Sequence, residues 1–220
     1  MVDPPPGDAG TEPARPFTGV VLTGGASRRM GRDKGFLDPG DGGPVLARRA
    51  FDALMAAGAS RCLAVGGDAG RLRSLGFVPV PDDHPGDGPL AGLVTALVAA
   101  DADTVVVLSC DLPAIDGATV RTLVDLLGDD LRRDAVVPVV DGHRQVLAAA
   151  YRTSVHRHLA SRLAAGERSV RRALSGLSVH EWSGADPHRL VDLDLPEDVD
   201  HYAQGRRSGS FGNRPPTGRG

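Results

Sequence analysis

The chain has 220 residues, of which 41% are hydrophobic, and a formal net charge of −3. This length is enough for one well-buried core, and an acidic balance argues against general nucleic-acid binding. There is no apolar run of about 18 residues and no charged start followed by an apolar stretch, so we expect no membrane span, no secretory signal and a cytoplasmic protein.

Both ends of the chain differ in composition from the middle. Residues 1–16 contain five prolines and little apolar content, and residues 205–220 are rich in glycine, arginine, serine and proline. Such segments cannot bury enough apolar surface to fold by themselves. We therefore expect disordered tails at 1–16 and 205–220 and a single domain at 17–204.

Within that domain, short apolar runs alternate with segments of 3.6-residue periodicity. The expected strands are Gly19–Thr23, Arg61–Val65, Phe77–Val80, Thr104–Ser109 and Ala135–Val140, and the expected helices are Pro44–Ala57, Leu90–Ala100 and Gly117–Leu127. The alternation predicts a three-layer, Rossmann-like α/β fold, with a mainly parallel sheet, helices on both faces and ligands at the carboxyl ends of the strands.

The pattern changes after residue 140. The run 141–143 is typical of a hairpin turn, Val146–Tyr151 returns as a strand, and a helix is expected from about Ser154 to Leu163. We expect this half to shape the pocket of the acceptor substrate.

The loop after the first strand is rich in glycine and arginine. Gly24 and Gly25 allow a sharp turn that points backbone N–H groups at an anion, although the glycine spacing fits neither a P-loop nor G-x-G-x-x-G. Four cations follow within seven residues: Arg28, Arg29, Arg32 and Lys34. Lys34 is the only lysine among 25 basic residues, and its compact ammonium suits a phosphate. The loop is predicted to bind a triphosphate; the plainer alternative is a solvated turn.

An apolar strand ends in Ser109-Cys110-Asp111 and brings a carboxylate to the carboxyl edge of the sheet. Mg²⁺ needs only one or two protein carboxylates when substrate phosphates supply further oxygens. Asp111 is therefore a candidate Mg²⁺ ligand, with a turn-capping role as the alternative.

Three further segments carry weaker signals. Residues 81–92 combine Asp82, a candidate acceptor of hydrogen bonds from guanine or ribose, with Gly88 and Gly92, but such clusters are often ordinary turns. Residues 166–172 hold three arginines that suit a phosphorylated acceptor or form a solvated helix face. Asp194 either joins the metal site or caps the following helix.

In chain order, the motifs LTGGASRRMGRDK, PDDHPGDGPLAG, VVVLSCDLP, RQVLAAAY, AGERSVRRAL and DLDLPEDV closely resemble those of the molybdenum cofactor guanylyltransferases, within the nucleotidyltransferase superfamily. The resemblance covers about residues 19–202. One motif departs from it: where the family commonly has N-x-N-T-P, this chain has Asp192-Leu-Asp194-Leu-Pro196.

The resemblance implies GTP, Mg²⁺ and molybdopterin as ligands. It assigns the nucleotide to Leu22, Gly24, Gly25, Lys34 and Asp82, Mg²⁺ to Asp111, and the pterin to Gly88, Gly92, Arg168, Asp192 and Asp194. We expect the molybdopterin phosphate to attack the α-phosphorus of GTP and expel pyrophosphate, with Lys34, Arg29 and Asp111 as the catalytic residues.

Other interpretations remain open. The chain could be a related nucleotidyltransferase that uses CTP or a sugar 1-phosphate, a non-catalytic nucleotide-binding module, or an adaptor that acts through its arginine-bearing tail. If the chain is a molybdenum cofactor guanylyltransferase, we also expect a possible handover of its product to molybdoenzymes or their chaperones. We expect no role for a membrane or a nucleic acid.

Overall fold

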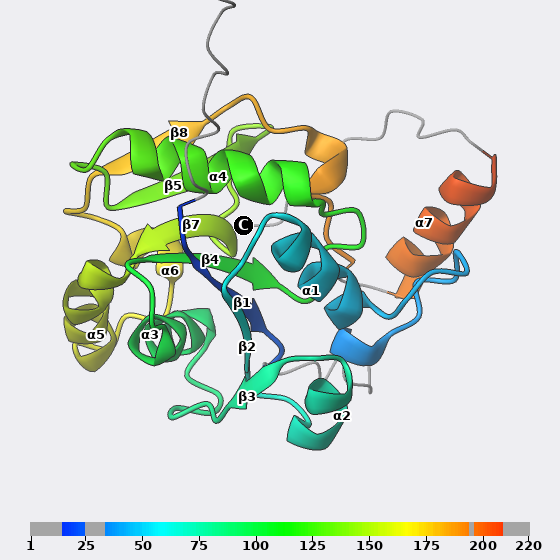
Figure 1. Ribbon diagram of the computed structural model, residues 1–220, viewed down its shortest axis with the longest axis horizontal. Coiled ribbons are helices and arrows are strands. Elements are labelled where there is room, and N and C mark those ends of the chain that lie inside the picture. Colours follow the sequence, from blue (N-terminus) through cyan, green and yellow to red (C-terminus); the bar gives the residue numbers. More distant parts are fainter. Residues whose placement is uncertain (1–14, 25–33, 194–195, 209–220) are drawn as a thin grey trace, which may run out of the picture.

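Eight strands form one central sheet in the computed structural model, which describes residues 15–24, 34–193 and 196–208 (Figure 1). They are β1 (Thr18–Leu22), β2 (Arg61–Val65), β3 (Val78–Val80), β4 (Thr104–Ser109), β5 (Ala135–Val140), β6 (His143–Arg144), β7 (Ala148–Arg152) and β8 (Val179–Trp182). The order is β3-β2-β1-β4-β7-β5-β6, with β8 beside β5. Strands β1 to β4 pair in parallel, whereas β7 runs antiparallel between β4 and β5. The sheet is thus mainly parallel, as predicted.

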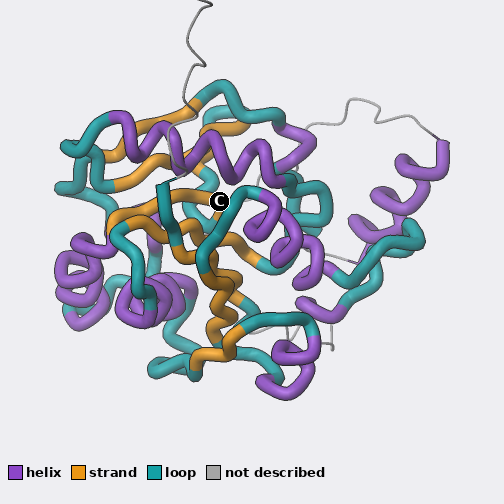
Figure 2. Tube along the Cα trace, in the orientation of Figure 1, coloured by secondary structure: helices purple, strands orange, loops and turns teal. Residues whose placement is uncertain are grey.

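Helices cover both faces of this sheet. They are α1 (Leu46–Ala56), α2 (Ala69–Ser74), α3 (Pro89–Ala99), α4 (Gly117–Asp129), α5 (His156–Ala164), α6 (Val170–Ala173) and α7 (Pro196–Ser208), together with the 3₁₀ turns η2 (Lys34–Phe36), η3 (Thr153–Val155) and η4 (Pro187–Arg189). Figure 2 shows the strands running between helices that lie on either side of them. The three-layer α/β fold predicted from the sequence is confirmed.

Alternation along the strands divides the apolar interior into two cores. In β1, Val21 packs into the core under α1 and α4, whereas its neighbour Val20 packs into the core under α3, α5 and α6. Both side chains are completely buried. Successive residues of a strand point to opposite faces, so a strand covered on both sides must be apolar throughout. This explains why the central strands are continuous runs of valine, leucine and alanine.

Two of the longer helices, α3 and α4, begin at residues that favour a helix start. The Asp116 side chain accepts a hydrogen bond from the Thr119 N–H at 2.9 Å and caps α4. Gly88 precedes α3 and Pro89 occupies its first position, where no N–H is needed. In the part of the chain that the structure describes, no helix is long and apolar enough to cross a membrane.

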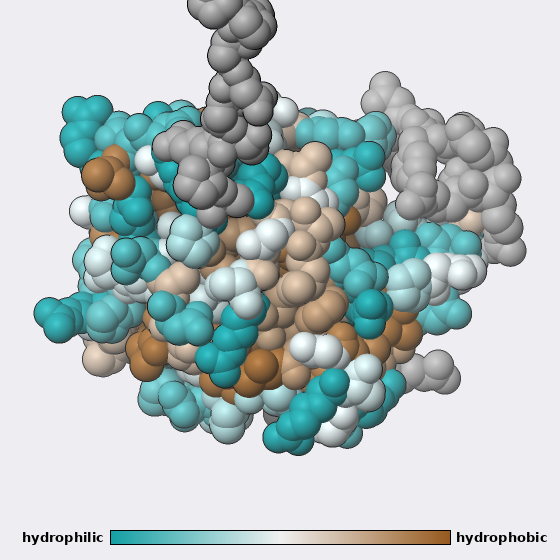
Figure 3. All heavy atoms as spheres, viewed as in Figure 1, coloured by the Kyte–Doolittle hydropathy of each residue, from teal (hydrophilic) through white to brown (hydrophobic). Residues whose placement is uncertain are grey.

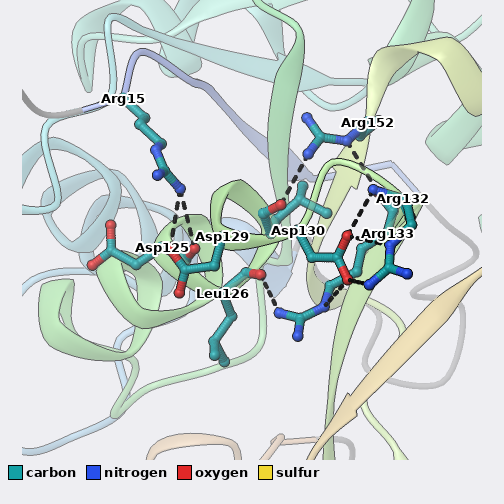
Figure 4. Close-up of polar contacts among 9 residues, drawn as sticks. Arg15, Asp125, Leu126, Asp129, Asp130, Arg132, Arg133 and Arg152 are labelled. Atoms are coloured by element: carbon teal, nitrogen blue, oxygen red, sulfur yellow. Dashed lines mark hydrogen bonds and ion pairs between the residues drawn. The ribbon is translucent and has the colours of Figure 1, made fainter.

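The carboxyl end of α4 is tied to the neighbouring strands by arginine side chains (Figure 4). The Arg152 guanidinium, at the end of β7, donates to the Leu127 carbonyl at 2.9 Å and to the Arg133 carbonyl at 3.0 Å. Asp130 pairs with Arg132 across the turn that follows the helix. Carbonyls at a helix end lack partners within the helix, and these guanidinium groups supply them. The contacts help to hold β7 in its place beside β5.

The last helix crosses the boundary expected at residue 204, because α7 ends at Ser208. Adding residues to a formed helix costs less free energy than starting a new helix. The glycine, arginines and serine at 205–208 therefore continue α7 past residue 204. Residues 15 and 16 of the expected amino-terminal tail are described, and Arg15 pairs with Asp129 at 3.3 Å. Residues 1–14 and 209–220 lie outside the described residues. The face seen in Figure 3 is hydrophilic around its outline and less polar near its middle, around α1.

The order of the strands reverses at β1, and this reversal marks the edge of the sheet where a ligand site is expected. The chain proceeds from β1 to β2 and β3 on one side, and then returns to place β4 on the other side of β1. Leu22 and Ser109, the last residues of β1 and β4, lie opposite each other in the sheet. The loops that leave these two strands diverge there, which opens the position where α/β proteins bind their ligands.

Candidate active site

An ammonium and a carboxylate meet at this edge of the sheet. Lys34, in η2, places Nζ 3.5 Å from Oδ2 of Asp111, which follows β4. The side chains are only 15% and 18% exposed, respectively. The only lysine of the chain and the predicted metal ligand therefore share one site, although 77 residues separate them in the sequence.

Two backbone and side-chain contacts hold Asp111 in place. The Ser109 hydroxyl donates a hydrogen bond to Oδ1 of Asp111, while the backbone N–H of Leu193 donates to the Asp111 carbonyl at 3.0 Å. The second bond brings Asp192, the residue before Leu193, next to the same segment. Of the two aspartates expected near the pterin, Asp192 is thus close to the Asp111 backbone, whereas Asp194 lies outside the described residues.

Gly24 lies in tight contact with the loop after β2. Its N–H donates to the Val65 carbonyl at 3.0 Å, and a Cβ built on Gly66 would lie only 2.7 Å from the Gly24 Cα. The Thr23 hydroxyl donates to the Gly66 carbonyl at 2.9 Å. A Cβ built on Gly24 would lie 3.7 Å from Oδ2 of Asp82, so the predicted nucleotide residues Gly24 and Asp82 are neighbours. Asp82 itself accepts a hydrogen bond from the backbone N–H of residue 84 at 3.0 Å, which fixes its side chain.

The amino-terminal half of α3 adds further predicted residues. A Cβ built on Gly92 would lie 3.5 Å from the Leu22 side chain, and one built on Gly88 would lie 3.5 Å from the Arg168 carbonyl. The Arg168 guanidinium lies 3.5 Å from Oδ2 of Asp87. The residues assigned to the pterin thus extend from the end of β1, along the start of α3, to the loop before α6.

Besides Asp194, two predicted site residues lie outside the part of the chain that the structure describes. Gly25 and Arg29 lie in the segment 25–33, outside the described residues. The loop predicted to bind the triphosphate is therefore described at its two ends, by Gly24 after β1 and by Lys34 beside Asp111.

The donor set suits Mg²⁺ held jointly by protein and substrate. No group of three or more metal-ligating side chains gathers within the described ranges 15–24, 34–193 and 196–208. Mg²⁺ binds through one or two carboxylates together with substrate phosphates, and Asp111 offers one such carboxylate at the carboxyl end of a strand. The residues therefore fit the ion.

Three contributors to the site were not predicted from the sequence. Ser109 precedes Asp111 by two residues, a spacing at which a short hydroxyl side chain can reach a carboxylate. Gly66 follows the predicted strand Arg61–Val65 in a Gly-Gly pair, a signal of a turn at the edge where ligands bind. Thr23 was assigned to the strand, and its bond to Gly66 depends on strand pairing.

Comparison with known proteins identifies relatives of the whole domain. Residues 19–181 match the family model described as the MobA-like NTP transferase domain. A probable molybdenum cofactor guanylyltransferase of Chloroflexus aggregans is 34% identical over 83% of this chain and 91% of its own length. A protein of Opitutus terrae with the same name is 38% identical over 85% of this chain and 95% of its own length.

A solved structure shares the fold at lower identity. The molybdopterin-guanine dinucleotide biosynthesis protein A of Archaeoglobus fulgidus superposes with a TM-score of 0.71 at 21% identity, covering 87% of this chain and 99% of that one. The resemblance inferred from the motifs is confirmed. The chain belongs to the family of MobA-like nucleotidyltransferases that includes the molybdenum cofactor guanylyltransferases.

Proposed function

We propose that the protein transfers GMP from GTP to the terminal phosphate of molybdopterin, with release of pyrophosphate. The observation that carries the proposal is the meeting of Lys34 and Asp111, 3.5 Å apart, at the edge of the sheet where the chain order reverses. A triphosphate needs a cation and close backbone N–H groups, and its metal ion needs a carboxylate. Lys34 supports the proposal as the cation and Asp111 as the carboxylate. The Gly24 N–H donates to the Val65 carbonyl, so we propose that the N–H groups that bind phosphate lie further along the loop.

The transfer requires no protein nucleophile. An oxygen of the molybdopterin phosphate attacks the α-phosphorus of GTP, the bond from that phosphorus to the bridging oxygen breaks, and pyrophosphate leaves with the electron pair. Lys34, with Arg29 and the loop N–H groups, would offset the negative charge that develops on the leaving group. Asp111 would hold Mg²⁺, which neutralises phosphate charge when bound.

The remaining residues orient the two substrates. Leu22, Gly24, Gly25 and Asp82 would bind the nucleoside and its phosphates; the Asp82 carboxylate, held beside Gly24, suits the N–H donors of a guanine edge. For the acceptor we propose Gly88, Gly92, Arg168, Asp192 and Asp194. Holding two phosphates in line for attack supplies much of the rate of such reactions.

We further propose that the protein acts in the cytoplasm and passes its product to molybdoenzymes or their chaperones. GTP and molybdopterin are the partners that this activity requires, and neither a membrane nor a nucleic acid takes part in it.

The test is a transfer assay with the purified chain. The protein is incubated with Mg²⁺, molybdopterin and one nucleoside triphosphate at a time, and both pyrophosphate and the nucleotide-linked pterin are measured. We expect product with GTP and at least tenfold less with CTP, ATP or UTP. Equal or higher product with CTP would refute the guanine preference, and pyrophosphate release only with a sugar 1-phosphate would refute the acceptor.

A further inference from the structure

Four arginines from three elements line one open hollow on the surface. Arg144 comes from β6, Arg162 from α5, and Arg171 and Arg172 from α6. Leu174 and Leu177 also line the hollow: Leu174 is buried in the apolar core beneath α3 and α5, and Leu177 is half-buried and packs against that core. The cavity volume is about 580 Å³, within the range of sites that bind small molecules.

The backbone that carries these arginines is firmly held. The Glu167 N–H donates to the Arg162 carbonyl at 3.0 Å, and the Glu167 carboxylate accepts from the N–H groups of residues 168 and 169 at 2.8 Å each. His158 on α5 is hydrogen-bonded to the Ala173 carbonyl at 2.9 Å, which joins α5 to α6. Arg171 donates to the Arg144 carbonyl at 3.5 Å. A ligand would therefore meet exposed arginine side chains that extend from a fixed backbone.

The positive charge of the hollow is only half compensated. Arg144 pairs with Glu181 on β8, and Arg172 pairs with Glu167. Within the part of the chain that the structure describes, Arg162 and Arg171 form no ion pair with a carboxylate. Guanidinium groups that lie near one another without paired carboxylates repel one another. A phosphate reduces this repulsion, because its oxygens accept two parallel N–H bonds from the planar guanidinium group of an arginine.

We propose that this arginine hollow is a second anion site, which binds the phosphate ester of a small aromatic heterocycle. The phosphate lies among the guanidinium groups of Arg162 and Arg171, and the ring covers the half-buried side chain of Leu177. None of the lining residues belongs to the surroundings of Lys34 and Asp111. The arginine hollow is separate from the proposed triphosphate site at Lys34 and Asp111, which we call the triphosphate cradle. The proposal does not depend on the transfer reaction proposed above.

The predicted acceptor motif therefore divides between two places. In the segment 166–172, Arg168 turns to Asp87 at the start of α3, whereas Arg171 and Arg172 line the hollow. Two chemically similar sources offer a phosphorylated heterocycle: a guanine nucleotide and a phosphorylated pterin. Binding measurements with both decide which one the hollow receives.

Calorimetric titration of the full chain tests the proposal. GMP is titrated without divalent ions into Lys34→Ala protein, so that binding at the triphosphate cradle is weakened. Adding Arg162→Ala and Arg171→Ala should lower the remaining GMP affinity by about tenfold. The matched control adds Arg73→Ala and Arg157→Ala, two exposed helix arginines outside the hollow, and should change the affinity by less than about twofold.

Further ligands separate the parts of the claim. Inorganic phosphate should bind at least tenfold more weakly than GMP, and guanosine should not bind measurably. Repeating the titration with molybdopterin, with and without Arg162→Ala and Arg171→Ala, identifies the source, because the ester whose affinity falls with these two substitutions is the ligand of the hollow. An equal loss of affinity in both double variants, or phosphate binding as tight as that of GMP, overturns the proposal.

Discussion

Gly66→Ala tests whether the close packing of two loops sets the nucleotide position. The new Cβ would lie 2.7 Å from the Gly24 Cα and 3.0 Å from its nitrogen, whereas ordinary contacts begin at 3.4 Å. One of the two backbones must therefore move by about 0.7 Å. A displacement of about 1 Å in a positioned group can lower a rate about 100-fold, so we expect kcat/KM for GTP to fall roughly 10- to 100-fold.

Backbone strain must be separated from this effect. Gly66 has φ +76°, a left-handed conformation that costs an alanine about 1–2 kcal/mol. Gly42 has φ +79° and nothing within 4 Å of its built Cβ, so Gly42→Ala carries the same strain without the contact. For a chain of this length, each kcal/mol lowers Tm by about 2–4 °C in either variant.

The assay compares GTP-dependent pyrophosphate release by the two variants, with Tm measured on the same samples. Only Gly66→Ala should lose kcat/KM, since only it pushes on Gly24. If both variants keep wild-type kinetics, or both lose activity in step with Tm, the packing of Gly66 on Gly24 does not position the nucleotide.

Three other predictions address single contacts. Ser109→Ala removes the hydroxyl bonded to the site's carboxylate and should lower kcat about tenfold with little change in Tm; an unchanged kcat would show that this bond is dispensable. The Arg71 guanidinium lies 3.6 Å from the centre of the Phe36 ring, two residues after Lys34, so Arg71→Ala should raise KM for GTP about two- to fivefold, and an unchanged KM would contradict this. Hydrogen bonding to Arg172 lowers the pKa of Glu167 to about 2, so this carboxylate stabilises the fold above its ordinary pKa of 4.5 and the contribution is lost as pH falls toward 2. In an NMR titration, Arg172→Ala should move that midpoint upward.

The main strands and helices were predictable because their periodicity is local. The runs Arg61–Val65 and Thr104–Ser109 occur as strands with the expected bounds. The short elements α2, α6 and β8 were not predicted, since four to six residues hold at most two periods of their pattern, too few to distinguish it from a loop. The antiparallel insertion of β7 between β4 and β5 is a non-local pairing that no local pattern encodes.

The same distinction applies to the site. Lys34 and Asp111 were predictable because each stands out locally, one as the only lysine and the other as an acid at the end of an apolar strand. The contact of Gly66 with Gly24 depends on how β1 and β2 lie in register, and the arginine hollow depends on three elements meeting after residue 140. Neither relation has a signature within one segment of sequence.

The rates of Lys34→Ala and Asp111→Ala in GMP transfer test the central claim most directly. Both should lower kcat by about 10²–10³, because each removes charge stabilisation at the transferred phosphate. Arg48→Ala, which removes an exposed cation paired with Asp52 on α1, serves as the control and should stay within about twofold of wild type. If folded Lys34→Ala and Asp111→Ala proteins transfer GMP at the wild-type rate, this pair of residues is not the catalytic site.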